Sequence, residues 1–218
     1  MELTRSVHAT SRRGQALIAM RDAIVEGTWP PGRQLKQDVL AEQLGVSAGV
    51  VREVLRQLES EGLVRHELNR GVFVCDVSRD ELLELLLPVR VQLECFAALR
   101  ALPTLAEQAF APLPECVERM AAAAGQSDVA ALNEADLAFH RAIIDAAGSA
   151  QAQQLWQSIL PRIRAELQRL APRHRDLAEI VDEHRLLLDV LRRGDAAELR
   201  PTLDDHILGI ARTLGGVE

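Results

Sequence analysis

Four side chains in the second half of the sequence are of types that hold metal ions. Asp136 and His140 are four residues apart, so on a helix they project from one face. His184 and His206 lie among apolar residues in later segments with helical periodicity. Three helices of a bundle could therefore bring one carboxylate and three imidazoles to a common centre. This set suits zinc, nickel, manganese or iron(II), and an octahedral ion would keep two positions open.

These histidines also have an ordinary explanation. A histidine taken singly is more often solvated or packed in a core than bound to a metal, and an Asp-x3-His spacing alone is a weak signal. We assign His8, His66 and His174 to this ordinary class. The residue types by themselves therefore leave open both a metal site and a set of unrelated histidines.

The segments that would position these side chains are helical. A capping box at Ser78–Glu81 begins the second half, and no useful strand-like alternation follows Cys75. Pro88, Pro161 and Pro201 lie inside helical patterns and predict kinks or displaced boundaries. An all-α bundle is expected. Its helices are predicted over about Ser78–Leu102, Thr104–Ala124, Val129–Ala146, Ala150–Leu170, Arg175–Arg193 and Ala196–Leu214.

The first third of the chain has a different pattern. Gly45 is suited to end one helix and Ser47 to cap the next. Apolar alternation on both sides of an Asn-Arg-Gly turn predicts a β-hairpin. The expected fold is a winged helix-turn-helix with three helices and a hairpin wing. Its elements are predicted over about Ser11–Glu26, Gln37–Leu44, Ser47–Ser60, Leu63–His66 and Val72–Cys75.

In a helix-turn-helix, the start of the second helix enters the major groove, and its arginines reach phosphates or guanine edges. The stretch LAEQLGVSAGVVREVLRQLESEGLVRHELNRGVFV, residues 40–74, resembles the winged helix of the GntR family of bacterial regulators. The resemblance implies that Ser47 and Arg52 contact phosphates or bases. It also implies that Gly71 allows the wing to approach the minor groove.

The sequence departs from this family at three positions. Ala48 and Gly49 stand where many relatives have Arg and Thr, and Asp38 stands where some have Arg. Either the operator differs from the usual one, or other residues carry more of the binding, namely Lys36, Arg56 and Arg70 in the wing. A winged helix used for protein contacts is the alternative to DNA binding.

The stretch from about Ser78 to Leu214 resembles the FCD domain, the C-terminal domain of FadR-type GntR regulators. That family has Asp-x3-His on one helix and one histidine on each of two later helices. Asp136, His140, His184 and His206 match this pattern in order. The resemblance therefore implies that these four residues hold a divalent metal ion.

The same resemblance implies that Arg90 faces the metal pocket and helps to hold an anionic effector. An arginine in an apolar helix needs a partner, and Glu94 one turn away offers a local ion pair as the alternative. Asn133 and Arg162 or Arg164 are further candidates for lining the pocket. A metal and an arginine together suit a carboxylate, such as a small organic or sugar acid.

The charge is divided unevenly along the chain. The net charge is −7, with 10 Lys and Arg against 9 Asp and Glu up to Cys75, and 15 against 23 afterwards. A nearly neutral first third gives only weak support for DNA binding. We expect a DNA-binding domain at residues 1–76, with a flexible tail at 1–12. Residues 77–218 are expected to form an all-helical domain for effector binding, metal binding and dimerisation.

Several classes of protein are excluded on sequence grounds. No apolar run approaches a membrane span, and the N-terminus lacks the apolar core of a signal peptide. Cys75, Cys95 and Cys116 are widely spaced and odd in number, which favours small buried side chains in a reducing cytoplasm. HExxH, P-loop and GxSxG motifs are absent, so an enzyme is not expected.

The function expected from these features is transcription regulation. A homodimer would bind a pseudo-palindromic double-stranded operator, and a small acid at the metal site would change its affinity for DNA. Repression is the commoner mode in the family that the sequence resembles. Two alternatives remain: a regulator for which the ion itself is the signal, and a hydrolase in which the metal activates water.

Overall fold

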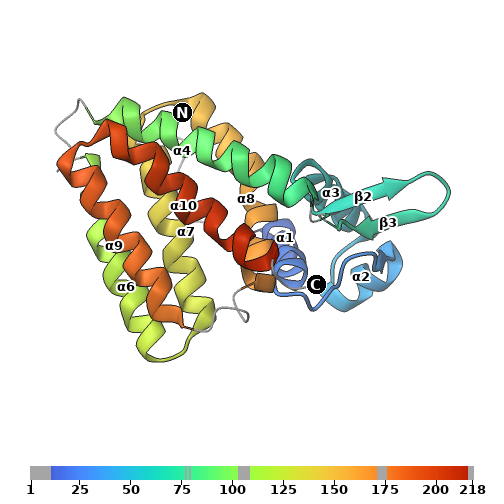
Figure 1. Cartoon of the computed structure of the whole chain (residues 1–218). Helices are drawn as coiled ribbons and strands as arrows, with labels where there is room; N and C mark the ends of the chain where they lie inside the picture. Colours follow the sequence, from blue (N-terminus) through green and yellow to red (C-terminus); the bar gives the residue numbers. More distant parts are fainter. Residues whose placement is uncertain (1–10, 77, 79, 103–108, 171–175, 216–218) are drawn as a thin grey trace, which may run out of the picture. The chain divides into compact units, whose positions relative to one another are not determined.

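The computed structural model describes residues 11–76, 78, 80–102, 109–170 and 176–215, and only the backbone of residues 166–170 and 210–215. The chain separates into two compact units, Met1–Asp76 and Val77–Glu218 (Figure 1). Each unit has its own hydrophobic core. No helix among the described residues is both long enough and apolar enough to cross a membrane.

The first unit is a winged helix-turn-helix, as predicted. Its helices are α1 (Arg12–Val25), α2 (Gln37–Leu44) and α3 (Ala48–Ser60). Its strands β1 (Gln34–Leu35), β2 (Val64–Glu67) and β3 (Gly71–Val74) form an antiparallel sheet in the order β1-β3-β2. The apolar side of α3 contributes Val51, Val54, Leu55 and Leu58 to the core, and all four are fully buried.

Local signals define the turn between α2 and α3. Gly45 has a φ of 63° and ends α2 in the left-handed conformation, which costs little for a residue without Cβ. The Ser47 hydroxyl accepts a hydrogen bond of 3.3 Å from the Val50 amide and caps α3. Both predicted roles are confirmed.

Two details of this unit differ from the predictions. Strand β1 was not predicted, because its two residues are too short to show alternation; Gln34 pairs with Phe73 and Leu35 with Val72. Helix α1 begins at Arg12, in agreement with the helix predicted from about Ser11, so Arg12 belongs to the helix and not to the predicted tail; the Ser11 hydroxyl caps it by accepting from the Gly14 amide. The rest of the tail, residues 1–10, lies outside the described residues.

The second unit is an all-α bundle, and its described residues contain no strand. It begins with a π-helical turn, η1 (Glu81–Leu86), that continues into α4 (Leu87–Ala101). The bundle then comprises α6 (Leu113–Gly125), α7 (Val129–Ala146), α8 (Ala150–Leu170), α9 (Leu177–Arg193) and α10 (Ala196–Gly215). Contacts of α7 with α4, α6 and α8, and of α10 with α4 and α9, build the core.

The prolines explain where this bundle departs from the predicted helices. Pro88 has no N–H and lies in the first turn of α4, after the wider π turn, so the helix predicted over Ser78–Leu102 is present but changes from π-helical to α-helical beside this proline. Helix α6 begins at Leu113 and not near Thr104, because Pro112 and Pro114 are tolerated only at a helix start. Residues 103–108 lie outside the description. Helices α8 and α10 run through Pro161 and Pro201, so no boundary falls there.

Candidate metal centre and DNA-contacting surface

Three helices bring the four predicted metal ligands together. Asp136 and His140 lie on α7, His184 on α9 and His206 on α10, and all four are buried. One potential ligand atom from each lies within 4.8 Å of the other three. His206 Nε2 lies 3.1 Å from His140 Nε2, and Asp136 Oδ1 lies 3.1 Å from His184 Nε2 and 3.7 Å from His140 Nε2.

Each imidazole is oriented by an oxygen atom at its other nitrogen. His140 Nδ1 lies 2.6 Å from Glu94 Oε2, and His206 Nδ1 lies 3.0 Å from Glu183 Oε2. His184 Nδ1 donates over 2.7 Å to the Ile180 carbonyl oxygen, its neighbour one turn earlier. Because these oxygens accept hydrogen bonds, the Nδ1 atoms carry the protons in neutral rings. The unprotonated Nε2 atoms then all face one centre.

This donor set fits a divalent cation. Lone pairs of neutral Nε2 atoms about 3 Å apart repel each other, and a cation between them turns that repulsion into coordination. Asp136 Oδ2 and His184 Nε2 are buried and have no hydrogen-bond partner among the described residues. Buried polar atoms without partners are rare and costly, so a ligand at this centre would stabilise them.

The electrostatics place two of the residues in the state that binds metals. Burial favours a neutral carboxyl at Asp136, but contacts with His140 and His184 outweigh it and hold the pKa well below the ordinary value. Burial holds the pKa of His206 well below the ordinary value, with help from His184 and His140. Both groups are therefore ready to donate electron pairs.

His140 is different because two carboxylates surround it. Burial and the Arg90 charge lower its pKa, yet Glu94 and Asp136 reverse this and leave the pKa above the ordinary value. The centre thus stabilises a positive charge at this position. A bound cation would supply that charge in place of the proton.

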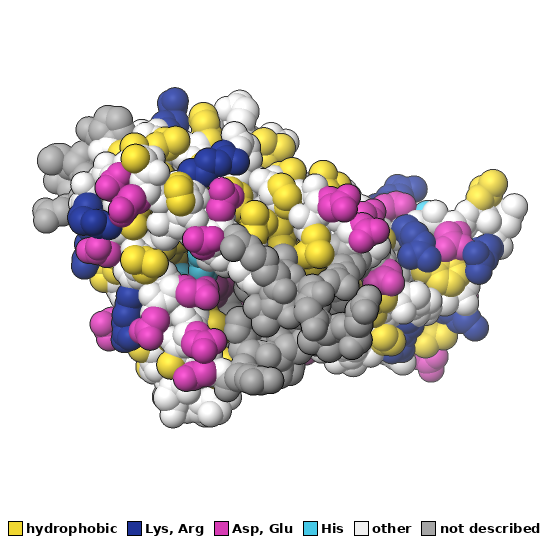
Figure 2. All heavy atoms as spheres, viewed as in Figure 1, with side chains coloured by type: hydrophobic (Ala, Val, Ile, Leu, Met, Phe, Trp, Pro, Cys, Tyr) yellow, Lys and Arg dark blue, Asp and Glu magenta, His cyan; other side chains and the backbone are white. Residues whose placement is uncertain are grey.

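A cavity of about 470 Å³ lies between α9 and α10, and one of the four candidate ligands lines it. His206 is part of its wall, and the carboxylates of Glu183, Glu198 and Asp205 also line it. Figure 2 shows acidic side chains gathered over the same two helices, with histidine atoms visible between them. Burial, with the nearby Glu179 and Asp136 carboxylates, raises the pKa of Glu183 to about 7.

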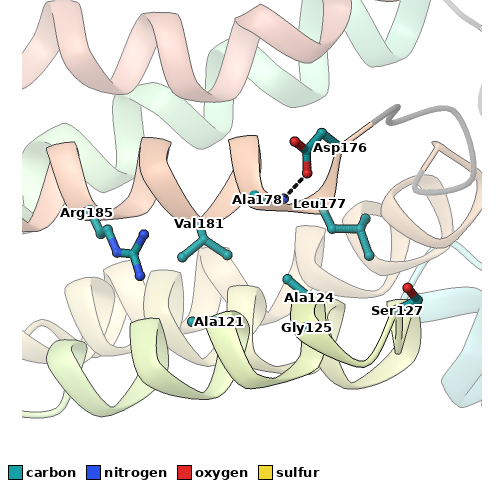
Figure 3. Close-up of a pocket in the computed structure, with 9 residues that line it drawn as sticks. All are labelled: Ala121, Ala124, Gly125, Ser127, Asp176, Leu177, Ala178, Val181 and Arg185. Atoms are coloured by element: carbon teal, nitrogen blue, oxygen red, sulfur yellow. Dashed lines mark hydrogen bonds between the residues drawn. The ribbon is translucent and has the colours of Figure 1, made fainter.

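A second cavity of about 460 Å³ lies between α6 and the start of α9 (Figure 3). Small and apolar side chains such as Ala121, Ala124 and Val181 line most of it. The Asp176 side chain beside it accepts a hydrogen bond of 2.8 Å from the Ala178 amide and caps α9. None of the four candidate ligands lines this cavity.

The predicted effector residues occupy different positions in the bundle. Arg90 is 2% exposed, and its Nε donates over 2.8 Å to Glu94 Oε1, while its Nη2 has no partner among the described residues. Asn133 is buried one turn before Asp136 on α7. Arg162 is half-buried on α8 and donates to the Ser158 carbonyl oxygen, and Arg164 pairs with Glu134. The structure therefore links Arg90, but not Arg162, to the metal centre by a chain of hydrogen bonds.

The predicted DNA contacts are on the surface of the first unit. Lys36 precedes α2, Ser47 caps α3, and Arg52 and Arg56 are one turn apart on α3; all four are exposed. Among the described residues, neither the Arg52 nor the Arg56 guanidinium has a hydrogen-bond or ion-pair partner. These side chains are free to reach a polyanion.

The wing holds a tight loop between β2 and β3. Asn69 and Gly71 have φ values of 60° and 102°. Arg70 is exposed and pairs with Glu67, and its backbone carbonyl oxygen accepts a hydrogen bond of 2.6 Å from Gln34 Nε2. The Arg70 guanidinium is also 5.4 Å from the centre of the Phe73 ring. Figure 2 shows basic side chains on this unit, interspersed with acidic ones.

The sequence interpretation missed Glu183 and underestimated Glu94. Glu183 precedes a candidate ligand, but its bond to His206 joins two helices that only the fold brings together. The ion pair of Glu94 with Arg90 was considered, since they are four residues apart, whereas its bond to His140 spans 46 positions. No spacing rule could have found the second contact.

Comparisons with known proteins agree with this architecture. Residues 13–74 match the bacterial regulatory proteins of the gntR family, and residues 84–209 match the FCD domain. The gluconate operon transcriptional repressor of Bacillus subtilis (strain 168) is 27% identical over 192 residues, covering 86% of this chain and 78% of the relative. The galactonate operon transcriptional repressor of Escherichia coli (strain K12) is 26% identical over 210 residues, covering 86% and 91%.

Solved structures give the same result. The crystal structure of a GntR regulator from Rhodococcus sp. RHA1 aligns with a TM-score of 0.79 and 27% identity, over 96% of this chain and 100% of that one. Both family models match their halves in the same order as the two units described above. The chain therefore belongs to the GntR family of bacterial regulators with an FCD domain, and it is a DNA-binding transcription regulator and not an enzyme.

Proposed function

We propose that this protein is a repressor whose affinity for its operator is controlled by a small carboxylate bound at a divalent metal ion in the helical unit. The observation that carries the proposal is the convergence of three Nε2 atoms and the Asp136 carboxylate in a buried centre. Four protein ligands would leave octahedral positions open to a carboxylate. When bound, the ion would supply Lewis-acid attraction for that anion.

The chain's own residues support an anionic effector. Arg90 has a buried Nη2 to which no described residue is bonded, and a carboxylate oxygen would accept from it. Asn133, on the metal-binding face of α7, and Arg162 are the further residues that we propose for the effector pocket. The gluconate and galactonate operons in the names of two relatives favour a sugar acid over other small carboxylic acids.

On DNA, we propose that α3 occupies the major groove. Ser47, Arg52 and Arg56 would contact phosphates or base edges, with Lys36 on the backbone. Gly71 would allow the wing to come close to the minor groove, where Arg70 would lie.

A homodimer is part of the proposal, because two winged helices are needed for a pseudo-palindrome. Apolar side chains form an exposed stripe along η1 and α4, at Leu85, Val89, Phe96 and Leu99, each between 41% and 54% exposed. Figure 2 shows hydrophobic side chains over this region. Their spacing of four, seven and three residues is typical of helices that pair side by side. Phe96→Glu should yield monomers by light scattering, whereas the control Leu186→Glu, at an exposed leucine of α9, should not.

A regulator that senses the ion itself is the second candidate. The acidic lining of the cavity at His206 favours it, because carboxylates at an entrance attract cations. The two candidates differ in metal retention: an ion that presents an effector survives dialysis, whereas a signal ion is exchanged at micromolar concentrations.

The test combines metal content with DNA binding. Mass spectrometry should find about one ion per chain in the wild type, and none in His184→Ala. His66→Ala, at an exposed histidine of β2, is the matched control and should keep the ion. Gel shifts on the upstream DNA should weaken when gluconate or galactonate is added to the wild type. Metal-free wild-type protein would contradict the proposed site while leaving DNA binding intact.

A further inference from the structure

Glu94 is a charged side chain in the interior of the helical unit, with no exposed surface. A buried carboxylate is costly unless its oxygens are paired. Both oxygens of Glu94 have a partner: Oε1 accepts from Arg90 Nε over 2.8 Å, and Oε2 accepts from His140 Nδ1 over 2.6 Å. One carboxylate thus joins a candidate metal ligand to the candidate effector arginine.

The contact with His140 decides which nitrogen faces the metal centre. A carboxylate accepts only from a protonated nitrogen, so Glu94 keeps the proton on Nδ1 and leaves Nε2 to donate. Carboxylates in this position orient the ring and increase the basicity of the ligand. Since His140 is also fully buried, water cannot replace this contact.

The contact with Arg90 fixes the other end of the link. Glu94 binds Nε, and in the part of the chain that the structure describes the buried Nη2 has no partner. The Trp156 ring, whose centre is 6.0 Å from Arg90 Cζ, restricts the guanidinium from another helix, α8. Arg90 is therefore held in place while one of its donors stays available.

We infer that Glu94 is a positioning residue that sets His140 for the metal, sets Arg90 for the effector, and couples the two binding events. A cation at His140 Nε2 makes Nδ1–H a stronger donor, so it draws the Glu94 charge away from Arg90. Arg90 then has more attraction left for a second carboxylate. By reciprocity, removing the Arg90 charge should tighten metal binding, mainly because the Glu94 carboxylate would then interact with His140 alone. This inference rests on the proposed metal site.

Glu183 provides the comparison within the same centre. It also accepts from a candidate ligand, His206 Nδ1, but its side chain is 47% exposed and it contacts no arginine in the described structure. Water can replace an exposed acceptor. Glu183→Gln should therefore weaken metal binding less than Glu94→Gln, and it should leave the Arg90 effect intact.

The experiment measures zinc dissociation constants of the full chain by competition with a chelator. Glu94→Gln should weaken zinc binding by about 10- to 100-fold, as expected for a partner of a metal ligand. Glu118→Gln, an exposed carboxylate of α6, is the control and should bind as the wild type does. Arg90→Met should bind zinc severalfold more tightly, and most of this gain should disappear in the Glu94→Gln background.

Nitrogen NMR of the histidine rings separates positioning from general destabilisation. At a pH above the raised pKa of His140, the neutral ring in the metal-free wild type should carry its proton on Nδ1, and Glu94→Gln should move part of that population to Nε2. If Glu94→Gln does not fold, the pair Arg90→Met and Arg90→Met/Glu94→Gln gives the same comparison without an unpaired guanidinium. Zinc binding within about twofold of the wild type, with unchanged ring signals, would overturn the inference. Wild-type protein that binds no zinc would instead overturn the proposed metal site.

Discussion

The two units place their functional side chains in opposite environments. In the winged unit, Lys36, Arg52 and Arg56 are exposed, and none of them belongs to the hydrophobic core of that unit. In the helical unit, Asp136, His140 and His184 are buried, and each contacts a residue from another helix or a backbone carbonyl. Replacing one of these exposed side chains should alter binding alone, whereas replacing one of the buried side chains should alter binding and the surrounding hydrogen-bond network.

The largest effect is expected at the metal centre. Asp136→Ala removes the single carboxylate ligand and should reduce zinc affinity about 100-fold or more, since a four-ligand zinc site is worth about 10–16 kcal/mol. Chelator competition measures this. Asp145→Ala, an exposed position later on α7, is the matched control. Equal loss in both variants would show that helix damage, and not ligation, is responsible.

Next is the loss of a DNA contact. Arg52→Ala should weaken operator binding by about 1–3 kcal/mol, roughly 5- to 150-fold, and leave the melting temperature unchanged because the side chain is exposed. Fluorescence anisotropy at several salt concentrations gives both affinity and salt slope. Arg119→Ala, exposed on α6 of the helical unit, should change neither. An unchanged affinity for Arg52→Ala would remove α3 from the DNA interface.

A backbone effect should follow in the wing. Gly71→Ala places a Cβ in a region that L-residues rarely adopt, with φ at 102°, and 3.2 Å from Gln34 Nε2. We expect a loss of about 1–3 kcal/mol in the free energy of unfolding of the first unit. Gly49→Ala is the control, because it is helical and its Cβ would meet only Ser47 Oγ at 3.7 Å. It should stabilise by about 0.4–1 kcal/mol in urea unfolding. If Gly71→Ala and Gly49→Ala changed the free energy of unfolding alike, the backbone strain expected for an alanine at position 71 would be contradicted.

The smallest effect is expected at the capping box of the helical unit. Hydrogen bonds from the Ser78 amide and hydroxyl lower the pKa of Glu81 below its ordinary 4.5. The ionised form is therefore favoured by folding. Its contribution is present above pH 4.5 and is lost as the pH falls through the lowered folded-state pKa. At pH 7 the wild type should melt at a higher temperature than Glu81→Gln, and this difference should vanish in acid. A difference that does not change with pH would show that it does not come from the ionisation of Glu81.

The sequence predicted the winged unit well because its signals are local. Gly45, Ser47 and the Asn69–Gly71 turn each specify backbone conformation within a few residues, and the apolar period of α3 places Val54 and Leu58 inward. What it missed, strand β1, depends on pairing with β3, whose register partners are 37 to 39 positions away. Such pairing has no local pattern.

For the helical unit, the sequence by itself determined which residue types could bind a metal and that Asp136 and His140 share a helix face. Only the tertiary structure decided that His184 and His206 meet them, and that Glu94 and Glu183 turn the Nε2 atoms of His140 and His206 toward one centre. The reason is physical. Helical spacing fixes neighbours within about a turn, whereas contacts across 46 residues depend on how whole helices pack.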